Sequence, residues 1–135
     1  MNLTETNDIF FCNARSGFKL ALSSLNFDKN SEILVPDFNC ESMFHYENDL
    51  NIKFTKFKIN FDLSINWNDL NSKLNINTRV LLFVNYFGVA NEIDKLLNFC
   101  NKNHILLFED NSHGYKGKFN NIELGKFGDI GISSP

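Results

Sequence analysis

The sequence predicts an α/β fold, a sandwich built on a largely parallel sheet, and three observations lead to it. Apolar segments with strand-like and helix-like spacing alternate along the chain. The strongest strand signal is an unbroken apolar run at residues 80–84, and a second run follows at residues 105–108. Between them, apolar residues recur at helical spacing over residues 93–100, which indicates a β-α-β unit.

The first part of the chain is expected to hold two helices around a strand. Ser16 is predicted to cap a helix that extends to residue 25, because its hydroxyl can accept a hydrogen bond from an unpaired backbone N–H. Residues 33–35 indicate a short buried strand that Pro36 stops. Asn39 is predicted to cap a second helix that runs through residues 43–44.

The remaining elements complete the alternation. Residues 52–57 indicate another strand, and Asn66 is predicted to cap a helix over residues 67–74. Residues 116–122 are expected to form a small hairpin or loop, and residues 125–132 lead into a last strand.

The composition excludes several classes of function. The chain has 135 residues, enough for one domain, and its net charge of −3 gives no basic footprint for nucleic acid. Its three cysteines, Cys12, Cys40 and Cys100, form no CxxC pair, so no metal site is predicted and reduced thiols are expected. No apolar run approaches the roughly 20 residues of a membrane helix. We therefore expect a soluble cytoplasmic protein without a membrane partner.

Residues 105–113 are the most informative stretch. The apolar residues 105–108 indicate a buried strand, and Asp110 is predicted to lie just past its end. Ligands of open α/β sheets bind outside the carboxyl ends of the strands. A carboxylate at such a position needs a cationic partner or solvent. A protonated ring nitrogen of a cofactor would serve, and the alternative is a solvated turn or a helix cap.

Four segments together resemble a known family. They are residues 13–17 (Asn-Ala-Arg-Ser-Gly), 85–88 (Asn-Tyr-Phe-Gly), 105–113 and 128–134. In this order and spacing the chain resembles the DegT/DnrJ/EryC1/StrS sugar aminotransferases, which use pyridoxal phosphate (PLP). The resemblance implies that residues 1–135 are the N-terminal portion of the large domain of a fold-type I PLP-transferase, an incomplete three-layer α/β/α sandwich. It also implies a homodimer.

The resemblance also implies roles for individual residues around PLP. Asp110 would pair with the pyridine nitrogen, so that the ring can act as an electron sink. His113 would lie beside the phenolic oxygen, and Cys40 occupies the position of a ring that covers the cofactor in many members. The turn that cradles the phosphate would be formed by Arg15, Ser16 and Gly17, with Ser134 as a further contact.

Each of these residues also has a simpler interpretation. His113 can be a loop histidine without a ligand, and Ser16 a helix cap without an anion. Ser134 can be an exposed serine at a strand end, and Ser133 can take its place. His45 and His104 have no partner residues at metal-ligand spacing, and we expect both to be ordinary surface or interface residues.

The implied activity is amino transfer from an amino-acid donor to a nucleotide-linked keto-sugar, in polysaccharide or secondary-metabolite biosynthesis. The Schiff-base lysine of the family falls beyond Pro135, and Lys126 does not match its motif. On this resemblance, residues 1–135 are also expected to lack the small C-terminal domain of the family. We therefore expect this chain to be inactive in transamination, with no catalytic residue of its own. The alternative is a non-catalytic domain that binds an intact homologue or another partner.

Overall fold

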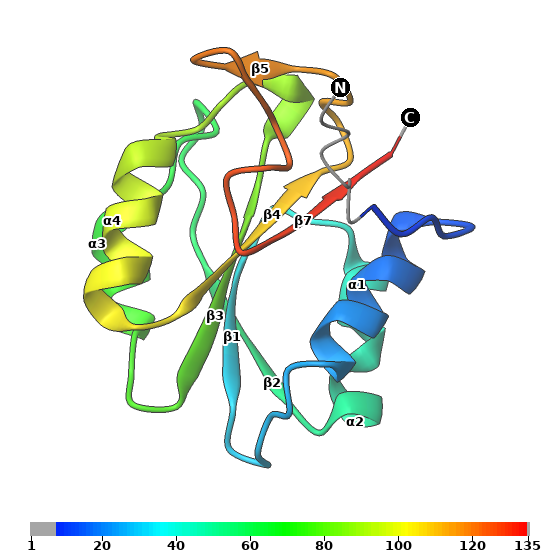
Figure 1. Ribbon diagram of the computed structural model, residues 1–135. Helices are drawn as coiled ribbons and strands as arrows, with labels where there is room; N and C mark the ends of the chain where they lie inside the picture. Colours follow the sequence, from blue (N-terminus) through cyan, green and yellow to red (C-terminus); the bar gives the residue numbers. More distant parts are fainter. Residues whose placement is uncertain (1–7, 135) are drawn as a thin grey trace.

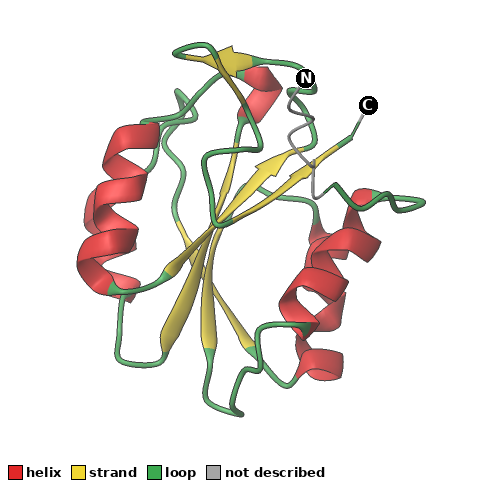
Figure 2. Ribbon diagram, viewed as in Figure 1, coloured by secondary structure: helices red, strands yellow, loops and turns green. Residues whose placement is uncertain are grey.

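Five parallel strands form the central layer of the computed structural model, which describes residues 8–134, and helices cover both faces of the sheet (Figure 1). The strands are, in spatial order, β2 (Lys53–Phe57), β1 (Glu32–Pro36), β3 (Thr78–Val84), β4 (Leu106–Asn111) and β7 (Ile130–Ser133). One face carries α1 (Ala14–Ser23), the 3₁₀-helix η1 (Glu41–Tyr46) and α2 (Glu47–Leu50). The other carries α3 (Trp67–Lys73) and α4 (Ile93–Asn103), which confirms the predicted three-layer sandwich (Figure 2).

Each face of the sheet has its own hydrophobic core. Successive side chains of a strand point to opposite faces, so Leu81 belongs to the core under α3 and α4 while Leu82 packs with Phe18 of α1. A strand covered on both faces must be apolar at every position. The uninterrupted run of residues 80–84 follows from this double burial.

Helix α1 begins earlier than predicted. Its N-cap is Asn13, whose side-chain oxygen accepts a hydrogen bond from the Ser16 backbone N–H at 2.9 Å. Ser16 lies in the first turn, and its own hydroxyl donates to the same Asn13 oxygen at 3.1 Å. The prediction of a Ser16 cap is therefore wrong, because the helix begins one turn earlier, where Asn13 is the cap and Ser16 supplies the capped N–H.

The segment after β1 also differs from the prediction. Asn39 does not cap a helix: its side chain accepts from the next backbone N–H, that of Cys40, at 2.7 Å. Cys40 stands at the N-cap position of η1 without a side-chain capping bond. The predicted Asn66 cap is confirmed, since its side chain accepts from the Asp69 backbone N–H at 3.0 Å.

Strand β4 continues three residues beyond its apolar run. Asp110 pairs in register with Val84 of β3 and with Ile132 of β7, and Asn111 pairs with Ser133. The prediction that Asp110 follows the end of the strand is wrong, because the two neighbouring strands extend the hydrogen-bonded ladder past the last apolar side chain. The predicted hairpin is confirmed, with β5 (Lys118–Phe119) paired to β6 (Ile122–Glu123).

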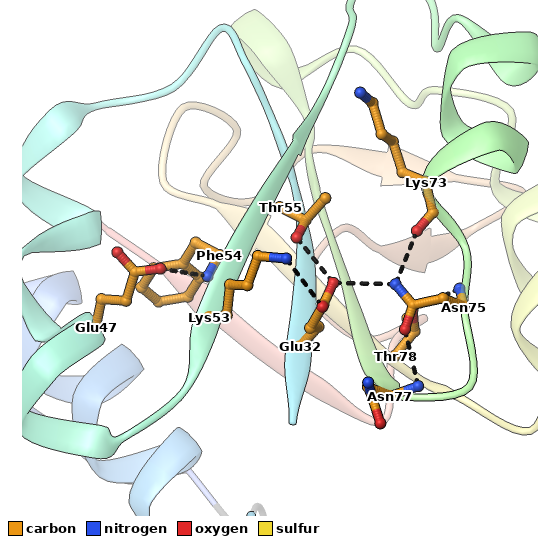
Figure 3. A network of polar contacts seen from close by, with 9 residues as sticks. All are labelled: Glu32, Glu47, Lys53, Phe54, Thr55, Lys73, Asn75, Asn77 and Thr78. Carbon is orange, nitrogen blue, oxygen red and sulfur yellow. Dashed lines mark hydrogen bonds and ion pairs between the residues drawn. The ribbon is translucent and has the colours of Figure 1, made fainter. Parts of the chain in front are cut away.

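A polar network holds the amino ends of the strands (Figure 3). The buried Glu32 carboxylate accepts from Lys53 Nζ at 3.0 Å, from Thr55 Oγ1 at 2.9 Å and from Asn75 Nδ2 at 3.0 Å. Burial alone would raise the pKa of Glu32, but the hydrogen bonds from Asn75, Lys53 and Thr55 outweigh it and lower the pKa below its usual value. Among residues 8–134, no helix is long and apolar enough to cross a membrane.

Candidate functional site

A cavity of about 470 Å³ opens at the carboxyl ends of the strands. It lies where the strand order changes direction, because the chain passes from β1 outward to β2 and then returns past β1 to β3. Ligands of open α/β sheets bind at such a point. The lining residues come from the start of α1, from the segment after β1 and from the ends of β3 and β4: Asn13, Ala14, Arg15, Phe38, Asn39, Cys40, Ser42, Met43, Val84, Tyr86, Asp110, Ser112 and His113.

Asp110 provides the buried charge of this cavity. Its side chain lies on the α1 face of the sheet, and the residue is only 6% exposed. One carboxylate oxygen accepts from the Ser112 backbone N–H at 2.9 Å. Within residues 8–134 no cation lies at ion-pair distance from it. A desolvated carboxylate in this state favours a ligand with a positively charged group.

Tyr86 closes one side of the cavity. Its hydroxyl donates to the Phe38 carbonyl and so fixes the segment after β1 above the end of β3. Burial raises the pKa of Tyr86 well above its usual value, and the negative charges of Asp37 and Asp110 raise it further. The phenol therefore stays neutral and keeps the proton that it donates to the Phe38 carbonyl.

A positive charge also borders the cavity. Arg15 lies in the first turn of α1, where the helix dipole adds partial positive charge. Cys40 Sγ lies 2.9 Å from Ser42 Oγ. The Ser42 hydroxyl, followed by the Ser42 backbone N–H, lowers the pKa of the Cys40 thiol, and the charge of Arg15 contributes in the same direction. The cavity is thus lined by groups of both charges, and suits a ligand that carries both.

His113 borders the cavity beside an aromatic neighbour. Its ring stacks on Phe87, with ring centroids 5.8 Å apart and planes inclined by 28°. Phe87 has a positive φ of 54° in the turn after β3, and its side chain is exposed. Two aromatic rings held in this way place an imidazole at the mouth of the cavity.

Asn39 contributes an unpaired donor. Its oxygen is already used by the Cys40 N–H, which fixes the orientation of the amide. The Asn39 Nδ2 is buried and has no acceptor in the part of the chain that the structure describes. A buried amide group without an acceptor is uncommon in folded proteins.

The predicted site residues fall into two groups. The cavity brings together Arg15, Cys40, Asp110 and His113 from three distant segments. Ser16, Gly17 and Ser134 do not line it. The Ser16 hydroxyl belongs to the cap of α1, and Ser134 is exposed beyond β7.

Gly17 has a packing role in the structure. It is buried in α1, and a Cβ at this position would lie 3.1 Å from Cδ2 of the Phe11 ring. The Phe11 ring therefore rests on the glycine, which points to close packing at this helix face.

Glu109, a residue that the sequence interpretation passed over, organises the loop beside the site. It is fully buried, and its carboxylate accepts four hydrogen bonds. The donors are Asn85 Nδ2 at 2.7 Å and the backbone N–H groups of Gly125, Phe127 and Gly128 at 2.7, 2.8 and 3.2 Å. Strand alternation was the signal that could have separated it from Asp110, since consecutive residues face opposite sides.

Known proteins resemble this chain in sequence. The sequence profile of the DegT/DnrJ/EryC1/StrS aminotransferase family matches residues 3–134. GDP-4-keto-6-deoxy-D-mannose 3-dehydratase of Escherichia coli O55:H7 is 31% identical over 108 residues, which are 78% of this chain and 28% of that protein. GDP-perosamine synthase of Vibrio cholerae is 24% identical over 123 residues, 90% of this chain and 34% of that protein. The chain thus spans about a third of the length of these relatives.

Solved structures resemble it in fold. The E. coli GDP-4-keto-6-deoxy-D-mannose-3-dehydratase with bound hydrated PLP superposes with a TM-score of 0.77 at 25% identity, over 90% of this chain and 33% of that one. The aminotransferase TlmJ from Streptoalloteichus hindustanus gives a TM-score of 0.78 over the same shares, at 16% identity. These likenesses confirm the α/β fold of PLP-dependent transferases that the sequence predicted.

Proposed function

The chain belongs to the DegT/DnrJ/EryC1/StrS aminotransferase family, and from this premise we propose that its cavity binds PLP in an enzyme that acts on a GDP-linked keto-sugar. The observation that carries the proposal is the Asp110 carboxylate, buried at the cavity and without a cation in the described part of the chain. A pyridinium nitrogen is a cation of suitable size and shape for it.

The residues of the cavity fit the two ends of the cofactor. PLP, when bound, supplies a protonated pyridine ring that withdraws electrons from the carbon next to a substrate amine. Asp110 would hold the proton on the ring nitrogen, because a buried carboxylate favours the charged form of a neighbouring base. Arg15 and the N-terminus of α1 provide the positive charge at the cavity and would bind the phosphate.

The other lining residues would orient the ring. His113, stacked on Phe87, would donate a hydrogen bond to an oxygen substituent of the pyridine. Tyr86 holds Phe38 in place through its hydroxyl, and this contact would keep water away from one edge of the cofactor. Asp110 lies in β4 and Arg15 in α1, which favours a preformed site at these two positions.

The names of the two relatives support a proposal for the substrate class. Both curated proteins carry GDP-linked sugars in their names, and one is a 3-dehydratase while the other is a synthase of an amino sugar. We propose a GDP-linked 4-keto-6-deoxy sugar as the substrate of the enzyme to which this chain corresponds. A thermal-shift comparison in the presence of pyridoxamine phosphate tests this: GDP-mannose is expected to raise Tm more than UDP-glucose, and equal shifts would remove the GDP assignment.

Cofactor binding is tested by equilibrium dialysis of the purified chain against pyridoxamine phosphate, which has no aldehyde and so cannot attach to lysines. Asp110→Asn removes the charge but keeps the shape, and is expected to weaken binding by about 10- to 100-fold, the value of a charge-assisted hydrogen bond. The matched control is Asp94→Asn in α4, an exposed carboxylate that does not line the cavity. Equal affinities of the two variants, or no binding by the unmodified chain, would contradict the proposal.

A further inference from the structure

The three cysteines occupy three different environments, and one of them faces the cavity. Cys40 is exposed and lines the cavity beside Ser42. Cys12 is exposed outside it, and its sulfur lies 3.7 Å from Ser16 Oγ. Cys100 is buried in the core under α3 and α4, where burial raises the pKa of its thiol to about 12. These differences predict different reactivities, since the thiolate is the nucleophile.

From this arrangement we propose that Cys40 is a modification site for soft carbon electrophiles, and that an adduct on its sulfur and a ligand in the cavity exclude each other. The exclusion rests on the proposed function, because the ligand in question is the PLP-type cofactor. The modification itself rests only on the surroundings of the thiol.

Two neighbours activate the Cys40 sulfur. The Ser42 hydroxyl lies at hydrogen-bond distance, 2.9 Å, and can donate to a thiolate. Arg15 lines the same cavity and adds positive charge, which favours the thiolate form. The Cys12 sulfur accepts from Asn13 Nδ2 at 3.4 Å and lies 3.7 Å from Ser16 Oγ. Both contacts are longer than that of Cys40 with Ser42, and Cys12 stands outside the cavity.

Independent features of the cavity show that a ligand belongs beside this thiol. Asp110 is more than nine-tenths buried and lacks a cation within residues 8–134, and the Asn39 amide nitrogen is buried without an acceptor there. Both groups line the space that Cys40 borders. A ligand bound at Asp110 would share this cavity with the sulfur, and an adduct on the sulfur would take up part of the same 470 Å³.

The chemical step is a simple substitution. With iodoacetamide as the probe, the thiolate sulfur attacks the methylene carbon, a sulfur–carbon bond forms, and iodide leaves with the bonding electron pair. The thiol proton passes to solvent. No oxidant or reductant takes part.

The experiment measures alkylation rates of all three thiols by peptide mass spectrometry after brief exposure of the full chain to limiting iodoacetamide at neutral pH. Cys40 is expected to react roughly fivefold faster than Cys12, and Cys100 only after denaturation. Ser42→Ala is expected to bring the Cys40 rate down toward that of Cys12 without changing the Cys12 rate. Equal rates at Cys40 and Cys12 in the unmodified chain would overturn the modification site, as would a Ser42→Ala variant that reacts undiminished at Cys40.

A separate measurement tests whether an adduct on Cys40 and a ligand in the cavity exclude each other. Saturating pyridoxamine phosphate is expected to slow alkylation of Cys40 several-fold and to leave Cys12 unchanged, because binding and modification must be reciprocally linked. If dialysis shows binding and Cys40 still reacts at its original rate, the exclusion is wrong. If dialysis shows no binding while Cys40 remains the fastest thiol, the proposed function fails and the modification site stands.

Discussion

Glu109 and Asp110 are consecutive residues of β4 whose carboxylates lie on opposite faces of the sheet. Glu109 accepts four hydrogen bonds from protein donors, whereas Asp110 accepts one, from the Ser112 N–H, and lines the cavity. The pleat of one strand thus separates a carboxylate that holds a loop from a carboxylate that can bind a ligand.

Replacement of Glu109 is expected to destabilise the fold. In Glu109→Gln one oxygen becomes an NH₂ group, which cannot accept from the N–H groups that face it, and buried unsatisfied donors together cost about 3 kcal/mol. The measurement is guanidinium unfolding followed by the fluorescence of the single tryptophan, Trp67. The control is Glu123→Gln in the exposed hairpin, where the unfolding midpoint is expected to stay unchanged. Equal midpoints of the two variants would show that the buried carboxylate does not hold the loop.

Glu32 is expected to make stability depend on acid pH. Its pKa in the folded state lies below the ordinary value of about 4.3. The stability it contributes is therefore fully present above that pH and is lost as pH falls through the folded pKa. Glu32→Gln is expected to flatten the decline of the unfolding free energy between pH 5 and pH 3. Parallel pH profiles of the variant and the unmodified chain would rule out this role.

The cap of α1 gives a direct test of which residue begins the helix. Asn13→Ala removes the acceptor of the Ser16 N–H and is expected to cost about 1 kcal/mol of unfolding free energy. Ser16→Ala leaves that bond in place and is expected to cost clearly less. A larger loss in Ser16→Ala than in Asn13→Ala would restore the serine cap that the sequence suggested.

Two glycines are expected to respond in opposite ways to alanine. A Cβ on Gly114 would lie 2.4 Å from Asn111 Oδ1 and 2.7 Å from the Gly88 Cα, and overpacking against backbone costs about 2 kcal/mol. Gly17 lies inside α1, where alanine gains helix propensity, and the Phe11 ring above it is partly exposed and able to shift. Thermal unfolding is expected to show a lower Tm for Gly114→Ala and an equal or higher Tm for Gly17→Ala. A strong decrease of Tm in Gly17→Ala would contradict the expectation that the Phe11 ring can shift.

The elements were largely readable from the sequence, and the errors lie at their ends. Periodicity found the strands and helices because it reflects burial of one face or of two. Periodicity placed the end of β4 at Phe108, because no apolar pattern marks the polar residues of this strand that pair with β3 and β7. It also placed the cap of α1 at Ser16, because serine and asparagine are equally good caps and only the backbone path decides between them.

By itself the sequence determined the α/β class, the family and the presence of a carboxylate near the carboxyl end of a central strand. Only the tertiary structure decided which of two adjacent carboxylates faces the cavity, and that Arg15 and Cys40 line the same cavity as Asp110. The reason is physical: local spacing depends on neighbouring residues, whereas strand order and register bring together side chains that are up to 100 positions apart along the chain, from Asn13 to His113 (113 − 13). The charge pattern of the cavity exists only after that pairing has formed.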